Sequence, residues 1–157
     1  MVHLIRFKDS PVRLRPLKSR RDDFFRINPR AIARLGAKRL VKRGLLVKGA
    51  EAPEDNPNHF ISKNVMAHWS PTRFSDGDVH VGFTVTVRTI SKRANERNLI
   101  RRRLRSAVNE NIRNFGIKGF DFVFTAREGL KEASYADMCA ELRKIFKYAE
   151  CRIKENG

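Results

Sequence analysis

The feature that most constrains the fold is a repeated change of hydrophobic period along residues 80–153. In residues 80–87 apolar residues alternate with small or polar ones, which is the period of a strand with one buried face. Residues 91–113 then carry apolar residues at helical spacing, residues 120–126 alternate again, and residues 134–153 return to helical spacing. This order of strand, helix, strand and helix predicts an α+β fold, built as an α/β sandwich.

The same periods predict which side chains form the core. The first strand has a buried face and an opposite face that is small and polar; the buried face comprises Val81, Phe83, Val85 and Val87. The second strand places three phenylalanines on one face, which are Phe120, Phe122 and Phe124. The last helix begins at a capping box formed by Ser134 and Asp137. Its apolar stripe comprises Tyr135, Met138, Cys139, Leu142, Phe146, Ala149 and Ile153.

The first half of the chain has weaker signals. Residues 1–16 are basic and contain two prolines, so we expect an extended N-terminal arm, followed by a single domain over residues 17–153. A short helix is predicted at about residues 19–27, and a strand is predicted between Gly44 and Gly49. Residues 50–78 are rich in Pro, Asn and Asp, which indicates an irregular connection that holds a strand near residues 59–69.

The charge of the chain points to a polyanionic partner. Thirty-four Lys and Arg residues against seventeen Asp and Glu residues give a formal net charge of +17. Such an excess opposes compaction through self-repulsion unless a polyanion neutralises it. Nucleic acid is the leading candidate, because bound Lys and Arg release counterions from phosphates. An anionic membrane surface is the second candidate, although no stretch approaches the roughly 18 apolar residues of a membrane span.

Cysteine and histidine usage indicates neither a disulfide framework nor a metal site. Cys139 and Cys151 are the two cysteines, and at helical spacing they point in different directions. We therefore expect reduced thiols and an intracellular, cytoplasmic protein. The four histidines lack metal-ligand spacing with each other or with the cysteines.

The helix at residues 91–113 has one apolar and one basic side. With Ile100 as the zero of angle and about 100° per residue, the apolar residues Leu104, Ala107 and Val108 fall within about 80° of it. An arc at about 100–200° presents a basic strip, formed by Asn98, Arg101, Arg102 and Arg105. Arginine suits phosphate binding because its planar fork can donate two hydrogen bonds to one phosphate.

A run of charge is usually a solvated face without a partner. Here the helix contains only Glu96 and Glu110 as acids, and the excess charge of the whole chain has the same sign. Both observations favour a polyanion that binds the basic strip.

The chain resembles the bacterial ribonuclease P protein component. Residues 81–85 match that family's strand VGFTV, and Arg97 with Asn98 matches the start of its Arg-Asn-Arg motif. The motif continues here in Arg101, Arg102, Leu104 and Arg105. Two further blocks agree in order, from Leu17-Lys18 to Asp23-Phe24 and from Phe120 to Tyr135. The sequence departs from the pattern at Leu99, where the second Arg belongs, and in longer connections at residues 86–92 and 50–78.

The resemblance implies a fold and a role. The fold would be a mixed sheet packed with about three helices, with a left-handed βαβ crossover, of the ribosomal protein S5 domain 2-like type. The protein would pair with ribonuclease P RNA, which performs the hydrolysis, and would bind the 5′ leader of precursor tRNA to promote its endonucleolytic removal. Mg²⁺ would be held mainly by the RNA subunit. No membrane and no obligate protein partner are implied.

By the same resemblance, particular residues would face RNA. Contacts to the catalytic RNA are expected from Arg88, Lys92, Arg97, Asn98, Arg101, Arg102 and Arg105. Phe24 is the candidate for the leader-binding cleft, since aromatic faces stack on unpaired bases; a place in the core is its alternative. The residues themselves indicate no nucleophile–base pair, so catalysis is expected in the RNA. A basic ribosomal or other structural RNA-binding protein without a cleavage role is the alternative function.

Overall fold

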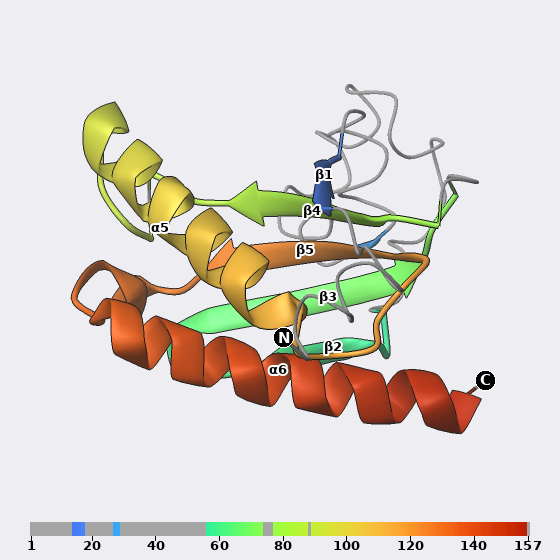
Figure 1. Cartoon of the computed structure of the whole chain (residues 1–157). Helices are drawn as coiled ribbons and strands as arrows, with labels where there is room; N and C mark the ends of the chain where they lie inside the picture. Colours follow the sequence, from blue (N-terminus) through green and yellow to red (C-terminus); the bar gives the residue numbers. More distant parts are fainter. Residues whose placement is uncertain (1–13, 18–26, 29–55, 74–76, 88, 157) are drawn as a thin grey trace, which may run out of the picture.

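The computed structural model describes residues 14–17, 27–28, 56–73, 77–87 and 89–156. In these residues a five-stranded mixed sheet carries two long helices on one face (Figure 1). The strands are β1 (Leu14–Pro16), β2 (His59–Ile61), β3 (Val65–Pro71), β4 (Val79–Thr84) and β5 (Phe120–Ala126). The helices are α5 (Ala94–Ile112), the short 3₁₀ helix η1 (Glu128–Lys131) and α6 (Tyr135–Asn156).

The strand order is β1-β4-β5-β3-β2. β4 pairs in parallel with both β1 and β5, while β3 pairs antiparallel with β5 and β2. The chain leaves β4, crosses in front of the sheet through α5 and returns in β5, which makes a left-handed crossover (Figure 1). The predicted order of strand, helix, strand and helix is confirmed, and so are the mixed sheet and the crossover that the resemblance implied.

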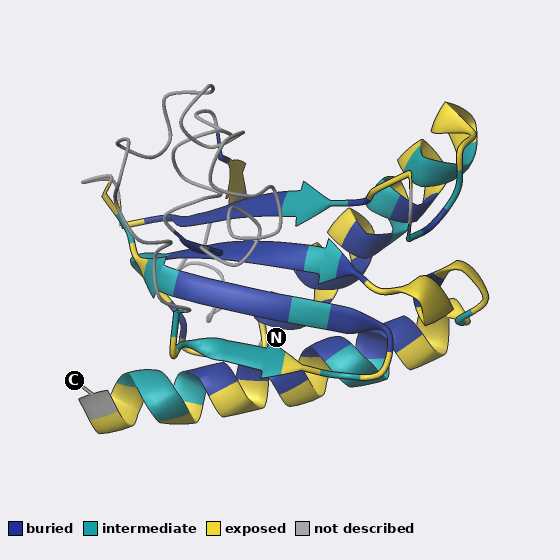
Figure 2. Ribbon diagram, turned by 180° about the vertical axis from the view of Figure 1, so that it is seen from behind, coloured by how far each residue is buried: buried dark blue, intermediate teal, exposed yellow. Residues whose placement is uncertain are grey.

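The main core lies between the sheet and the two long helices. The rings of Phe122 and Phe124 stack with centroids 5.8 Å apart, and Phe146 of α6 meets both rings edge-on. Trp69 of β3 packs beside Phe122. Figure 2 shows the resulting band of buried residues along β3, β4 and β5. The prediction that Phe120, Phe122 and Phe124 share the core face is confirmed.

The last helix begins where the sequence predicted. The Ser134 hydroxyl oxygen accepts a 3.1 Å hydrogen bond from the backbone N–H of Asp137, as an N-cap does. The predicted stripe is buried from Met138 to Ala149, and Ile145, which the prediction omitted, is buried with it. Tyr135 instead lies 36% exposed, and its hydroxyl donates a hydrogen bond to Glu110 of α5.

The strand predicted near residues 59–69 is a hairpin of two strands, β2 and β3. The polar residues between them turn the chain, and the carboxylate of Glu141 on α6 holds this turn. It accepts hydrogen bonds from the Ser62 hydroxyl, from the Asn64 backbone N–H at 2.7 Å and from the Asn64 side-chain amide at 2.8 Å. Gly129 lies against the same turn, since a Cβ there would come within 2.3 Å of the Asn64 side-chain oxygen.

The predicted strand at residues 80–87 requires two corrections. β4 ends at Thr84, so Val87 lies beyond it and is 50% exposed. The opposite face has the small and polar residues that were predicted, but His80 and Gly82 on it are buried. A second apolar cluster of Leu17, Ile27 and Val123 covers that side of the sheet.

Only part of the N-terminal region for which elements were predicted lies within the described residues. The end of the basic arm forms β1. Leu17, the residue that follows β1, donates a backbone hydrogen bond to the Val81 carbonyl at 3.1 Å. The helix predicted at 19–27 lies outside the described residues except for its last residue, Ile27. The strand predicted between Gly44 and Gly49 also lies outside them.

Candidate nucleic-acid interface

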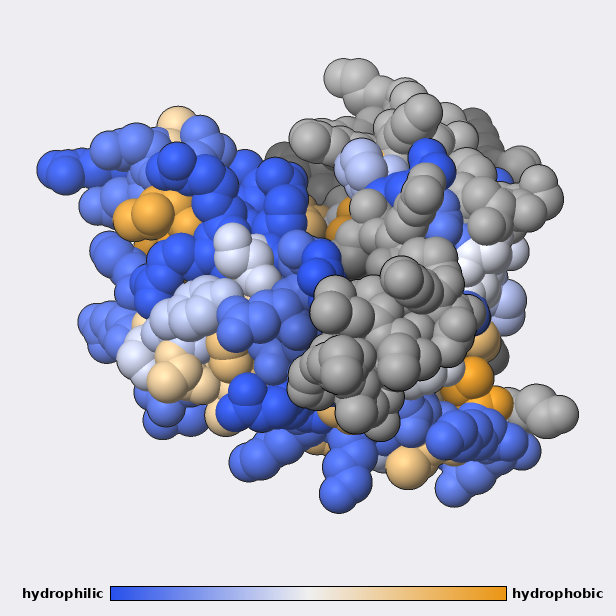
Figure 3. All heavy atoms as spheres, in the orientation of Figure 1, coloured by the Kyte–Doolittle hydropathy of each residue, from blue (hydrophilic) through white to orange (hydrophobic). Residues whose placement is uncertain are grey.

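The packing of α5 fixes which of its side chains can meet a partner. Ile100, Leu104, Ala107 and Val108 are buried against the sheet, as the helical period predicted, and Asn111 and Ile112 extend this stripe. The opposite side of the helix therefore faces outward. Figure 3 shows a mostly hydrophilic surface over this part of the molecule.

The predicted basic strip lies on that outward side. Asn98, Arg102 and Arg105 are exposed, and Arg101 is half-buried beside them. One guanidinium nitrogen of Arg101 donates a 2.9 Å hydrogen bond to the Asn98 side-chain oxygen, so two members of the strip orient each other. Within the described residues, neither Arg102 nor Arg105 pairs with a carboxylate. Four predicted site residues are thus brought together on one rigid helix.

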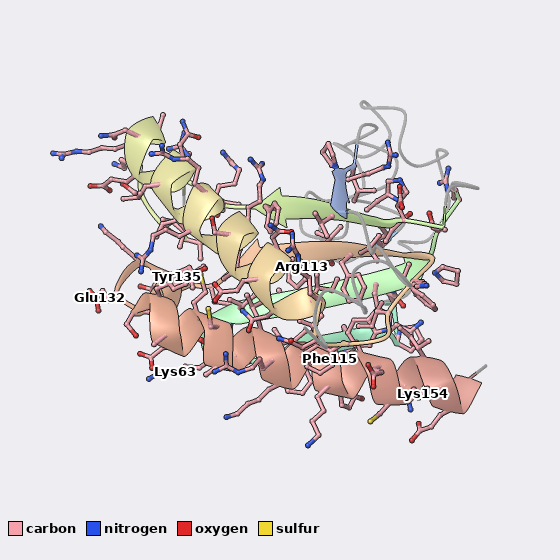
Figure 4. All side chains as sticks on the ribbon, in the orientation of Figure 1. Lys63, Arg113, Phe115, Glu132, Tyr135 and Lys154 are labelled. Atoms are coloured by element: carbon pink, nitrogen blue, oxygen red, sulfur yellow. The ribbon has the colours of Figure 1, made fainter. Side chains whose placement is uncertain are left out.

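The two acidic residues of α5 bond away from this strip. Glu96 lies 3.9 Å from Arg93 and 3.8 Å from Lys131, and a hydrogen bond from Ser91, together with these cations, lowers the pKa of its carboxyl. Glu110 accepts a hydrogen bond from the Tyr135 hydroxyl. Figure 4 shows Tyr135 at the start of α6, on the side that faces α5. The positive charge of the outward arc is therefore not neutralised by the acids of its own helix.

Arg97, the first arginine of the motif, is half-buried and organises the turn before α5. Its guanidinium donates hydrogen bonds to the carbonyl oxygens of Ser91 at 2.9 Å and Lys92 at 2.8 Å. These bonds fix the path of the connection into the helix. The helix lacks a side-chain cap at its Arg93 N-cap, so Arg97 is the side chain that ties this end together.

Arg105 is positioned by an aromatic ring. Its guanidinium carbon lies 5.7 Å from the centroid of Phe83 on β4, within the range of a cation–π contact. Phe83 stacks in turn on Phe124 of the core, with centroids 5.9 Å apart. Sequence reasoning identified Arg105 but not this support, because the contact depends on how closely α5 crosses β4.

Of the other positions singled out in the sequence, two lie within the described residues and two lie outside them. Lys92 is exposed in the connection. Leu99, at the position of the second motif arginine, is 48% exposed. Arg88 and Phe24 lie outside the described residues.

The described residues suit binding more than protein-borne chemistry. Within them no three His, Cys, Asp or Glu side chains gather where they could hold a metal ion. Nδ1 of His80 lies 3.2 Å from Oδ1 of Asp121, but the two side chains are only 5% and 0% exposed, beneath the second face of the sheet. Among the helices that are described, none is long and apolar enough to cross a membrane. The exposed arginines can donate charge-assisted hydrogen bonds to phosphates.

Comparison with known proteins gives one family. Over residues 36–150, which is more than half of the chain, the sequence matches the family model described as Ribonuclease P. None of the curated proteins matches the chain.

Two solved structures with similar folds are ribonuclease P proteins. The protein from Staphylococcus aureus is 17% identical, with a TM-score of 0.49, and the match covers 59% of this chain and 80% of that one. The protein from Thermotoga maritima is 18% identical, with a TM-score of 0.47, and the match covers 57% of this chain and 81% of that one.

Proposed function

The chain belongs to the ribonuclease P family and is a protein subunit of that ribonucleoprotein; we propose that it promotes removal of the 5′ leader from precursor tRNA while its RNA partner performs the hydrolysis. Association with ribonuclease P RNA follows from the family.

The outward arc of α5 meets the RNA subunit. The observation that carries this assignment is the set of Asn98, Arg101, Arg102 and Arg105 on one side of a helix whose other side is buried. The helix fixes the spacing of the backbone positions that carry these side chains, and the planar guanidinium fork loses less entropy per hydrogen bond to a phosphate than a flexible ammonium does. Lys92 extends the same surface along the connection, and Arg97 holds that connection in place. Arg88 is a further proposed contact that rests on the family resemblance alone.

Hydrolysis takes place in the RNA subunit. We assign the Mg²⁺ ions of the reaction to the RNA, as the family resemblance implies. In support, no three His, Cys, Asp or Glu side chains gather within the described residues where they could hold a metal ion. The protein contributes affinity and positioning, which lower the barrier by holding substrate and catalyst in the reactive geometry. With free thiols at Cys139 and Cys151, we place the complex in the cytoplasm.

The leader lies on the side of the sheet opposite α5 and α6. Ile27, at the end of the segment that contains Phe24, packs on Val123 of that side. Phe24, three residues before Ile27 in the sequence, would stack on an unpaired base of the leader. The partner that gains from this contact is precursor tRNA, because mature tRNA has no leader to offer.

Equilibrium titrations of the reconstituted holoenzyme test this assignment. Wild-type protein should favour precursor over mature tRNA, and Phe24→Ala should reduce that preference by about 1–3 kcal/mol if one base stacks there. Affinity for the RNA subunit should stay nearly unchanged, because the basic helix is a separate surface. Equal weakening for both tRNAs would mean that Phe24 belongs to the core and does not contact the leader.

A further inference from the structure

A groove of about 560 Å³ lies between α5 and the sheet edge where β1 pairs with β4. Its walls come from three elements and comprise Arg15, Pro16, Val81, Phe83, Arg105, Ser106 and Asn109. The volume falls within the roughly 300–1,000 Å³ that is usual for sites of small molecules. Arg15 and Arg105 are among these lining residues. Arg15 pairs with Asp78, whereas Arg105 has no carboxylate partner in the described part of the chain, so it is Arg105 that favours a ligand with negative charge.

A ladder of stacked groups leads from the core to this groove. Phe122 stacks on Phe124 at 5.8 Å, Phe124 stacks on Phe83 at 5.9 Å, and Arg105 lies over Phe83 at 5.7 Å. The guanidinium is the outermost member, and a ring that is anchored in the core holds it. Its position is therefore set without a carboxylate partner in the described part of the chain.

We propose that this groove receives one unpaired nucleotide of RNA, whose base stacks on the guanidinium of Arg105. The inference rests on the proposed function, because it takes α5 to face RNA. Guanidinium planes stack on unpaired bases as aromatic rings do. The N–H groups at the edge of the same guanidinium can donate to the adjoining phosphate, so one side chain serves both halves of a nucleotide.

The walls of the groove select an unpaired nucleotide rather than a duplex. A base can stack on the Arg105 guanidinium only if its face is not already covered by a neighbouring base, and bases in a duplex are covered in this way. Asn109 and Ser106 place an amide and a hydroxyl on the α5 wall. An asparagine amide matches the N6 and N7 edge of adenine, so we expect adenine to be preferred. Arg113 donates a 3.4 Å hydrogen bond to the Asn109 side-chain oxygen, which orients that amide.

Ribonuclease P RNA is the expected source of the nucleotide, because the proposed function places the leader of precursor tRNA on the opposite side of the sheet; the leader is the other source to be tested. Their chemistry is the same at this site, so the groove does not distinguish them. Affinities for ribonuclease P RNA and for precursor tRNA, measured separately, distinguish the two sources.

The first test compares two ligands that differ only in the base. Adenosine 5′-monophosphate and ribose 5-phosphate are titrated separately into the full-length protein, and the backbone amide resonances of Ser106 and Asn109 are followed by NMR. We expect adenosine 5′-monophosphate to shift these two resonances. Ribose 5-phosphate should cause only a small part of that shift. Arg105→Lys, which keeps the charge but loses the planar face, should remove the difference. Equal shifts from both ligands, or none, would overturn the proposal.

The second test locates the source of the nucleotide. Arg105→Lys should weaken RNA binding between about 5-fold and 150-fold, the effect of losing one base stack. A loss of affinity for ribonuclease P RNA assigns the nucleotide to that RNA, and a loss confined to precursor tRNA in the holoenzyme assigns it to the leader. Arg103→Lys is the matched control, because it makes the same change on the flank of α5 that faces α6. Thermal melting checks that both variants fold.

A second variant separates failure of this inference from failure of the proposed interface. Asn109 is exposed, so Asn109→Ala should keep the fold and weaken the response to adenosine 5′-monophosphate. If Arg102→Ala weakens RNA binding while Arg105→Lys and Asn109→Ala do not, the groove proposal is wrong and the interface stands. If none of the three weakens RNA binding, the assignment of the α5 arc is wrong as well.

Discussion

The hydroxyl of Tyr135 on α6 donates a 2.8 Å hydrogen bond to Oε2 of Glu110 on α5. This bond joins the two helices and directs the Glu110 carboxylate toward α6, away from the arginines of the outward arc. The relationship has a functional consequence, because an acid directed at the arc would weaken its attraction for phosphates. It also has a measurable signature in the titration of the tyrosine.

The hydrogen bond to Glu110, with a smaller effect of burial, raises the pKa of Tyr135 from 10 to about 12. Because the folded-state pKa lies above the unfolded one, the neutral phenol stabilises the fold below about pH 10, and this contribution is lost as the pH rises through 12. In a Tyr148→Phe background, where Tyr135 is the one remaining tyrosine, Glu110→Gln should lower the midpoint of phenolate absorbance. An unchanged midpoint in protein that circular dichroism shows to be folded would contradict this pairing.

Arg102→Ala should weaken binding to ribonuclease P RNA with little change in stability, because the side chain is exposed. The slope of log K against log salt should become shallower by about 0.9, the value for one phosphate contact. Filter binding at several salt concentrations measures both quantities. Lys147→Ala on the exposed side of α6 is the control, since it removes one charge far from the arc; an equal change in slope would show that only net charge matters.

Leu99→Arg should tighten RNA binding by about 0.5–1.5 kcal/mol, the net contribution of one typical added hydrogen bond. The side chain is 48% exposed at the position where the family has arginine, so the fold should tolerate the change. Leu99→Gln introduces a long polar side chain without the charge, so it should give no gain in affinity for RNA. A drop in melting temperature without a gain in affinity would show that Leu99 has a packing role.

Glu141→Ala should destabilise the fold by about 2–3 kcal/mol, because three hydrogen bonds from Ser62 and Asn64 end on this one carboxylate. Urea denaturation gives the free energy of unfolding. Glu132→Ala removes an exposed carboxylate near the start of the same helix and should stay within about 0.5 kcal/mol of the wild type. Equal losses in the two variants would mean that the hairpin turn does not depend on Glu141.

The sequence was most informative where a single period ran over many residues. Ile100, Leu104, Ala107 and Val108 repeat at helical spacing, and that spacing alone predicted which side of α5 is buried. The alternation of Phe120, Phe122 and Phe124 did the same for β5. The basic arc could then be predicted as the side of the helix that the apolar residues leave facing outward.

Features that depend on tertiary contacts could not be read in this way. The burial of His80 follows from Leu17 and Ile27, which cover the second face from another part of the chain. The hairpin of β2 and β3 looked like one strand because its turn is held by Glu141, about 80 residues further along the sequence. The contact between Arg105 and Phe83 depends on a helix crossing a strand, and local spacing carries no signal for it.

The most direct test of the central claim is cleavage of precursor tRNA by reconstituted ribonuclease P at low magnesium concentration. The protein, stripped of RNA, is added to ribonuclease P RNA, and release of the 5′ leader is followed over time. We predict that the RNA with the protein cleaves much faster than the RNA alone at the same magnesium concentration, and that the protein alone releases nothing. Cleavage by the protein without RNA, or no effect of the protein on cleavage by the RNA, would contradict the account.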